Sequence, residues 1–295
     1  MIASLRYTTD MTLSALLNSY LESRECSPRY RESLMRTVRK AEISGLVEIC
    51  QLSPERVNRL LNGLTVGATT KANIRRELLT LWRYAYEEGM TEVFPARITR
   101  IRPKHTPPQA WSLPDLSRLL QAAQQDEHAI GGVTRLRVCD VMPAWIGIAY
   151  DTGLRFSDVL NLRLSNIRNG CISTVANKTG KPLVRRMSEG TEQCVAELAE
   201  RSPDGTLFLW AVTRRRACKT WRAFLDRHGF EGSSKWLRRS CATYIEQQQP
   251  GAATAYLQHS NPTLAARHYL DASLFGVPTG PPPIQRQRSA SRPCT

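Results

Sequence analysis

Long apolar stretches are missing from this 295-residue sequence. No segment approaches the roughly 20 apolar residues that a membrane-spanning helix needs, and the opening MIASLRYTTD lacks the apolar core of a secretory signal. The eight cysteines stand singly, without a CxxC pair or a Cys/His cluster at zinc-ligand spacing. These absences predict a soluble, cytoplasmic protein with reduced thiols and no contact with a membrane.

Two further absences narrow the chemistry. The sequence contains no GxxxxGK[ST] loop, so ATP is not expected, and no carboxylate cluster at metal-ligand spacing. We therefore expect neither a metal nor a cofactor.

Acidic residues are also scarce, since 26 Asp and Glu stand against 41 Lys and Arg, a net charge of +15. This balance indicates an anionic partner, with nucleic acid as the first candidate and a membrane surface or simple solubility as alternatives.

The first hundred residues carry the signals of short helices. Ser27-Pro28 and Ser53-Pro54 each have the form of an N-cap followed by proline at the first helical position, and a longer apolar pattern begins near Thr70. Residues 93–109 combine proline with basic residues and lack periodicity, which is typical of a linker. The sequence predicts a helical domain over residues 1–105.

Residues 106–275 are predicted to form a second domain, mainly helical with one small antiparallel sheet. Ser112 and Asp115 have capping-box spacing, and the apolar run 141–150 predicts a buried helix that ends at Thr152-Gly153. Turn signals on both sides of Cys171–Val175 favour three strands. The segment 276–295 is proline-rich without acidic residues, so we predict a disordered basic tail.

Short motifs follow one another along this second domain. They are TGLR at 152–155 with FSDVLNL after it, NKTGK at 177–181, KWLRRSCAT at 235–243, LQH at 257–259 and RHY at 267–269. In this order they resemble the catalytic boxes of the tyrosine recombinases, the phage integrase family, over roughly residues 110–272. The N-terminal helices are similar to that family's SAM-like core-binding domain only in size, helicity and position.

The residue types also fit one chemistry without the family name. A phosphodiester under nucleophilic attack gains negative charge on its non-bridging oxygens, and two guanidinium groups can hold those oxygens with permanently charged donors. Arg155 and Arg238 are the candidates for this clamp, although a basic helix face is the alternative for Arg238 because Arg239 follows it. Asp158 is spaced to orient Arg155 across one helical turn.

Tyr269 is the candidate nucleophile. A free tyrosine, with a pKa of about 10, attacks poorly unless nearby positive charge favours its phenolate, and Arg155, Arg238 and His259 are the candidates for that charge. Tyr269 follows His259 by ten positions and is expected near the end of a helix begun by Asn261-Pro262. Two other tyrosines nearby are expected to pack in the core, Tyr244 and Tyr256.

The resemblance implies the remaining acid-base groups. Lys178 matches the lysine on the family's hairpin, whose implied role is to protonate the departing 5′ oxygen, and Lys181 is a rival for that role. Lys235 stands where the family commonly carries histidine, and an acid-base role is implied for it too. Gln258 stands before His259 where the family's motif has glycine.

The implied partner is double-stranded DNA, bound by a homotetramer on two recombination sites, with DNA-bending accessory proteins as further candidates. The implied function is site-specific recombination or integration through a 3′-phosphotyrosyl intermediate. A type IB topoisomerase and a catalytically inactive DNA-binding protein of the same fold are the alternatives. A basic run with Trp221 interleaved is suited to phosphate contacts, or is a solvated helix face, and comprises Arg214, Arg215, Arg216, Lys219 and Arg222.

Overall fold

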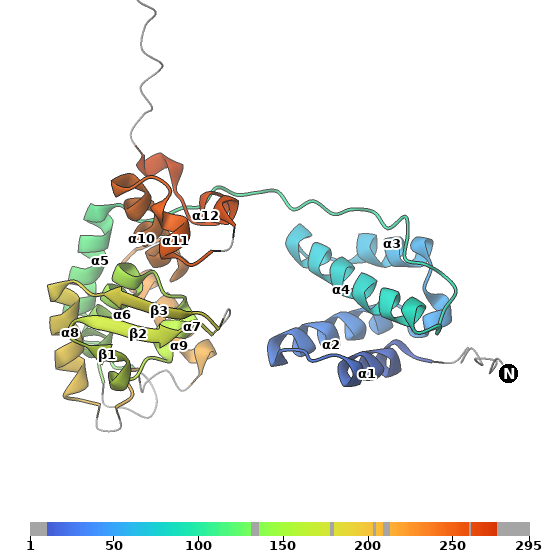
Figure 1. The fold of residues 1–295 in the computed structure, drawn as a ribbon, viewed down its shortest axis with the longest axis horizontal. Helices are drawn as coiled ribbons and strands as arrows, with labels where there is room; N and C mark the ends of the chain where they lie inside the picture. The colour runs from blue at the N-terminus through green and yellow to red at the C-terminus, as the bar shows by residue number, and fades with distance from the viewer. Residues whose placement is uncertain are drawn as a thin grey trace, which may run out of the picture. The chain divides into compact units, whose positions relative to one another are not determined.

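The chain folds into two compact units, Met1–Thr106 and Pro107–Thr295, called the first and the second unit below. The computed structural model describes residues 11–130, 136–177, 180–202, 205–208, 213–259 and 261–275. Helices dominate both units, and the second also holds a three-stranded antiparallel sheet (Figure 1). The predicted fold class is confirmed. The predicted tail, 276–295, lies outside the described residues.

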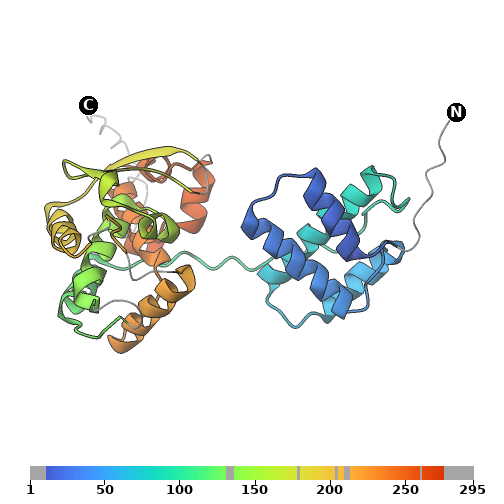
Figure 2. The same cartoon turned by 90° about the horizontal axis from the view of Figure 1, so that it is seen from below.

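The described part of the first unit is mainly helical, as Figure 1 and Figure 2 show from two directions. The predicted N-caps at Ser27 and Ser53 are present, and each side chain accepts a backbone N–H of the first turn. The helices are α1 (Leu13–Ser23), α2 (Pro28–Ile43), the 3₁₀ turn η1 (Ile49–Gln51), α3 (Pro54–Gly63) and α4 (Ala68–Glu87). None of the helices described in either unit is long and apolar enough to cross a bilayer.

A buried carboxylate joins two helices of the first unit. Glu77 on α4 is 2% exposed and accepts hydrogen bonds from Ser33 at 2.7 Å and Thr37 at 2.5 Å, both on α2. A buried charge is stable only when its lone pairs are satisfied. The two hydroxyls therefore fix how α2 and α4 pack around the leucine-rich core of this unit.

The second unit is built around α6 (Val138–Thr152), the predicted buried helix. It packs against α5 (Leu113–Gln125), α8 (Glu189–Ala199) and α10 (Lys235–Gln248). Ser112 caps α5 as predicted, and Gly153 ends α6 in the left-handed conformation. The remaining elements are α7 (Phe156–Leu160), η2 (Leu164–Asn166), α9 (Arg214–Arg227), α11 (Ala252–Tyr256), α12 (Pro262–His268) and η3 (Ala272–Leu274).

The sheet runs in the order β1-β2-β3, with β1 at Ile167–Arg168, β2 at Cys171–Val175 and β3 at Pro182–Arg186. All its pairs are antiparallel, and Val175 lies opposite Pro182. The turn between β1 and β2 is Asn169-Gly170, both at positive φ, as its sequence predicts. β3 is an edge strand, so one side of its backbone can bond outside the sheet.

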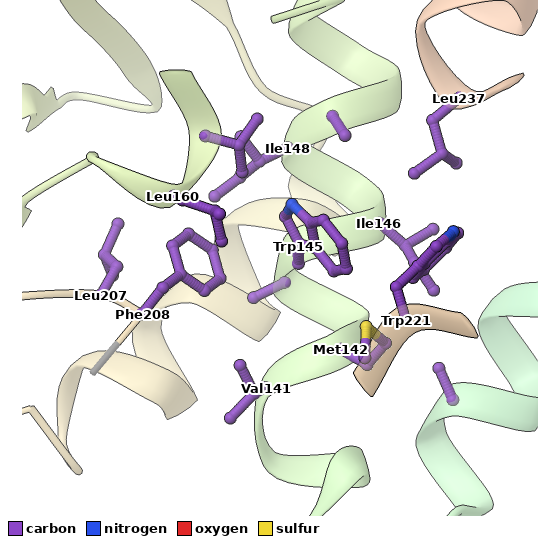
Figure 3. Close-up of a cluster of buried hydrophobic side chains, with 14 of the residues drawn as sticks. Val141, Met142, Trp145, Ile146, Ile148, Leu160, Leu207, Phe208, Trp221 and Leu237 are labelled. Carbon is purple, nitrogen blue, oxygen red and sulfur yellow. The ribbon is translucent and has the colours of Figure 1, made fainter. Parts of the chain in front are cut away.

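Tryptophans form the centre of the core (Figure 3). Trp145 of α6 lies 4.8 Å from Trp221 of α9 and 4.9 Å from Phe156 of α7, ring centroid to ring centroid. Trp111, which precedes α5, also contacts Trp221. These contacts hold the start of α7, where Arg155 is the N-cap, against the central helix.

A buried aspartate ties the end of α5 to the end of α9. Asp126 is 3% exposed, and its carboxylate accepts from Arg227 at 2.6 Å, from His228 at 3.0 Å and from the backbone N–H of His128 at 3.0 Å. Burial alone raises the pKa of this carboxyl, but these hydrogen bonds outweigh it and hold the pKa well below its ordinary 3.8.

We expect Asp126→Asn to lower the free energy of unfolding at neutral pH by about 3 kcal/mol, because it leaves buried donors without a charged acceptor. The folded pKa is depressed, so the contribution of Asp126 is complete above the unfolded pKa of about 4 and is lost as the pH falls below it. Urea unfolding across this range should therefore show the gap between wild type and variant narrowing in acid. Asp226→Asn, which removes an exposed ion pair with Arg222, is the control and should cost under about 0.5 kcal/mol.

Candidate active site

Arg238 lies at the centre of the candidate site. It follows the first turn of α10 and is only 6% exposed. Its guanidinium donates to the carbonyl of Gly153 and, at 3.2 Å, to the carbonyl of Leu257. The basic helix face considered for this residue is therefore wrong. One side chain instead connects the end of α6 with the end of α11, which brings separate motifs of the sequence together.

His259 and Tyr269 both contact Arg238. Nη2 of Arg238 lies 3.3 Å from Nε2 of His259, and the guanidinium carbon lies 5.0 Å from the centroid of the Tyr269 ring. The two rings are themselves 4.8 Å apart. A guanidinium can only donate, so the hydrogen bond requires Nε2 of His259 to accept. Burial lowers the pKa of Arg238, Tyr269 opposes that effect and Arg155 adds to it, yet an arginine remains charged.

Tyr269 closes α12, as the sequence predicts. Asn261 caps the helix by accepting from the N–H of Thr263 at 2.9 Å, and the N–H of Tyr269 donates to Ala265 at 2.9 Å. The side chain is half-buried and packs against the small cluster of Ala242, Ala253 and Leu257. The phenol is thus held at the edge of the core rather than within it.

The backbone around Tyr269 is fixed on both sides. Thr243 of α10 donates to the carbonyl of Tyr269 at 3.4 Å and accepts from the N–H of Asp271 at 3.1 Å. Arg239 donates to the carbonyl of His268 at 3.1 Å. Arg238 therefore faces the ring of Tyr269, whereas Arg239 bonds the backbone next to it.

Arg155 is the N-cap of α7 and is partly accessible, with its side chain 24% exposed. Asp158 lies one turn further on, 3.9 Å from Nη1 of Arg155, and also accepts from the N–H of Asn177 at 3.3 Å. Asp158 is buried. It therefore links the arginine to the start of the loop between β2 and β3.

Of the two lysines considered for the proton donor on the hairpin, the structure describes one. Lys178 lies outside the described residues, while its rival Lys181 is exposed and its carbonyl accepts from Ala176 at 3.0 Å at the base of the same loop. Lys235 is the first residue of α10 and is exposed one turn before Arg238. Residues three apart on a helix share a face, so Lys235 and Arg238 lie on one side of α10.

The basic run on α9 differs from its prediction in one respect. Arg214, Arg215 and Lys219 are exposed, but Trp221 is buried in the tryptophan core and does not interleave with the basic side chains. Trp221 is therefore unavailable to stack on a base. Tyr244 and Tyr256 pack against the core, as expected.

Sequence reasoning missed Arg185 on β3. This half-buried side chain donates to the carbonyl of Tyr256, and its guanidinium carbon lies 4.2 Å from the centroid of the Tyr256 ring. The sequence pattern does indicate it, because every second residue of a strand faces the same side. Leu183 and Met187 are buried apolar residues, and Arg185 lies between them on that side. In the described part of the chain, no group of three or more His, Cys, Asp or Glu is placed to hold a metal.

Gly153 offers a test of this geometry. Its φ of +59° favours glycine, and an added Cβ would lie 2.9 Å from Cδ2 of Leu257 and 3.1 Å from Sγ of Cys241. We expect Gly153→Ala to destabilise the second unit by about 1–3 kcal/mol and to displace the carbonyl that Arg238 binds. Urea denaturation measures the first effect. Gly205→Ala, at φ +72° with nothing within 4 Å of the added Cβ, isolates the cost of φ alone and should be milder.

The sequence matches a known family, and the fold matches solved structures. The model of the phage integrase family matches residues 115–274, more than half of the chain. The chain belongs to the phage integrase family. No curated protein matches the full sequence at a significant level.

Solved integrase and recombinase structures share the fold. The lambda integrase dimer bound to a COC′ core site has a TM-score of 0.71 and 19% identity, covering 92% of this chain and 80% of that one. The Tn1549 transposon integrase in complex with circular intermediate DNA has a TM-score of 0.71 and 16% identity, covering 90% and 97%. XerH bound to a difH substrate has a TM-score of 0.67 and 17% identity, covering 88% and 82%. At such identities the likeness establishes the fold.

Proposed function

We propose that this integrase-family protein cuts and rejoins DNA strands at specific sites, with Tyr269 as the nucleophile. The observation that carries the proposal is the buried guanidinium of Arg238, which contacts both His259 and the ring of Tyr269. A permanent positive charge beside a half-buried phenol suits attack on a phosphodiester. Arg155, partly exposed and close enough to lower the pKa of Arg238, would complete the clamp on the phosphate oxygens.

The proposed reaction needs no external energy source. The Tyr269 oxygen forms a bond to phosphorus as the bond to the 5′ oxygen breaks, which leaves a 3′-phosphotyrosine and a free 5′ hydroxyl. Lys178 is proposed to donate the proton that the 5′ oxygen takes up, and Lys235, in its neutral amine form, to accept the proton that the phenol releases. The 5′ hydroxyl of a partner strand then attacks the phosphorus of the phosphotyrosine. This step forms a new phosphodiester and releases Tyr269, whose phenol recovers its proton.

The net charge of +15 and the related structures support duplex DNA as the substrate. Lambda integrase has been crystallised as a dimer on a core site and as a tetramer on a Holliday junction. For this chain we propose residues 1–105 as the core-DNA-binding domain, residues 106–275 as the catalytic domain, and a homotetramer on two sites as the recombining species. Exposed basic residues of α9 are candidates for phosphate contacts, among them Arg215 and Lys219.

A nicked substrate tests the proposal. Duplexes that the protein binds are selected from a random library and nicked beside the cut, so that the short 5′-hydroxyl fragment diffuses away. We expect a denaturant-resistant complex that retains label from the strand ending in the 3′ phosphate. Bound duplexes without any such complex would indicate an inactive DNA-binding protein. Relaxation of a supercoiled plasmid without recombinant products would favour the type IB topoisomerase reaction instead.

A further inference from the structure

Gln258 adopts a backbone conformation that favours glycine. Its φ is +54°, and among the described residues only Arg97 and Asn169 share a positive φ without being glycine. A side chain in the left-handed region costs about 1 kcal/mol, so other interactions must hold it there. A glycine at this position would avoid that cost, and this chain has a glutamine instead.

The Gln258 side chain supplies such an interaction. Its Nε2 donates to the carbonyl of Pro182 at 2.6 Å, on the edge strand β3 and 76 positions away along the chain. Two residues earlier, the carbonyl of Tyr256 accepts from Arg185 of the same strand. The segment leading to His259 is thus attached to β3 at two points. The side chain of Gln258 reaches the backbone of β3, and the side chain of Arg185 on β3 reaches the backbone of Tyr256.

The turn at Gln258 determines where His259 lies. The N–H of Gln258 donates to Ala255 at 3.1 Å and that of His259 to Thr254 at 3.0 Å, so the chain reverses directly before the histidine. His259 emerges with its ring against both Arg238 and Tyr269. A small rotation about the Gln258 backbone would therefore move the imidazole away from the site.

We propose that Gln258 is a positioning residue, whose bond to Pro182 maintains the left-handed turn that places the imidazole of His259 beside Arg238 and Tyr269. Any effect on the reaction rate rests on the proposed function, because it exists only if this site cuts DNA. The effect on the turn itself does not.

Two substitutions separate positioning from stability. Gln258→Met keeps a long side chain and the strained φ but cannot donate, whereas Gln258→Gly removes the donor and the strain together. We expect Gln258→Met to slow single-turnover formation of the covalent complex by about five- to twentyfold at saturating DNA. Gln258→Gly should stay within about threefold of wild type, because glycine adopts the left-handed turn without the bond. If Gln258 served stability alone, folded Gln258→Met would cut DNA as fast as wild type, and that result would overturn the proposal. Asn169→Gly, at a left-handed position in the β1–β2 turn, controls for strain relief and should leave the rate unchanged.

A double-mutant cycle identifies the residue through which Gln258 acts. In a His259→Ala background, Gln258→Met should change the already reduced rate by less than about twofold, because the imidazole that Gln258 positions is already absent. The same five- to twentyfold loss in both backgrounds would overturn the proposal.

Hydrogen exchange of the free protein tests the turn without any reaction. In Gln258→Met the amide of His259, which bonds Thr254, should exchange about tenfold faster than in wild type, whereas in Gln258→Gly it should exchange at nearly the wild-type rate. Unchanged exchange in Gln258→Met would overturn the positioning role even if cleavage slowed. Failure of wild type to form a covalent complex would overturn the proposed function instead, and the exchange comparison would still decide the role of Gln258.

Discussion

Tyr269→Phe is expected to bind its DNA site with wild-type affinity and to form no covalent complex with it. The substitution removes one oxygen and keeps the ring that packs against His259, Arg238 and the cluster that includes Leu257. Folding should therefore be unaffected, while the atom that bonds phosphorus is absent. Binding is measured by a gel-shift titration, and the covalent complex by electrophoresis in denaturant after incubation with the nicked duplex.

Tyr244→Phe is the matched control for this result. Tyr244 lies on α10, as Arg238 does, and is partly buried against the core of the second unit. Burial raises the pKa of its phenol, which makes it a poorer nucleophile than an ordinary tyrosine. The control should form the covalent complex at nearly the wild-type rate. A complex that persists in Tyr269→Phe and disappears in Tyr244→Phe would show that Tyr244, and not Tyr269, is the nucleophile.

Arg238→Lys is expected to reduce cleavage by about a hundred- to a thousandfold, the usual cost of removing one preorganised donor to a developing oxyanion. The charge survives, but an ammonium cannot contact the Gly153 and Leu257 carbonyls, His259 and a phosphate oxygen together. Single-turnover cleavage at saturating DNA measures the loss. A rate within about threefold of wild type would show that charge alone suffices and that the fork of donors is not used.

Stability must be measured beside that rate, because Arg238 also joins two segments of the fold. Leaving the carbonyls it binds without a donor is expected to cost about 1–3 kcal/mol. Arg118→Met removes an exposed arginine paired with Asp115 and should change neither stability nor cleavage appreciably. Cleavage by Arg238→Lys that recovers fully at low temperature, where the variant is folded, would reduce the role of Arg238 to a structural one.

Local signals in the sequence predicted the elements that depend on neighbouring residues. Asn261-Pro262 correctly placed the start of α12, and Asn169-Gly170 the turn between β1 and β2, because capping and turn preferences act over a few residues. The prediction that Trp221 lies among the basic side chains was wrong, because residues adjacent in the sequence point to different sides of a helix and Trp221 belongs to the apolar stripe with Ala217, Phe224 and Leu225.

Contacts between distant residues could not be predicted in this way. Asp126 meets Arg227 about a hundred positions later, and nothing near either residue indicates the other. The same holds for Gln258 and Pro182. Gln258 seemed to weaken the motif when only its sequence was considered, whereas the structure gives it a bond that compensates for the backbone strain. The roles of the candidate site residues remain predictions for the experiments above.

Tyr269 is expected to bond covalently to the cleaved DNA strand. The covalent complex, digested with nuclease and protease, leaves a peptide whose nucleotide adduct can be located by fragmentation in a mass spectrometer. We expect a 3′-nucleotide phosphoester on Tyr269 within the segment RHYLD, at residues 267–271. An adduct on Tyr244 or Tyr256, or on a serine or cysteine, would contradict it.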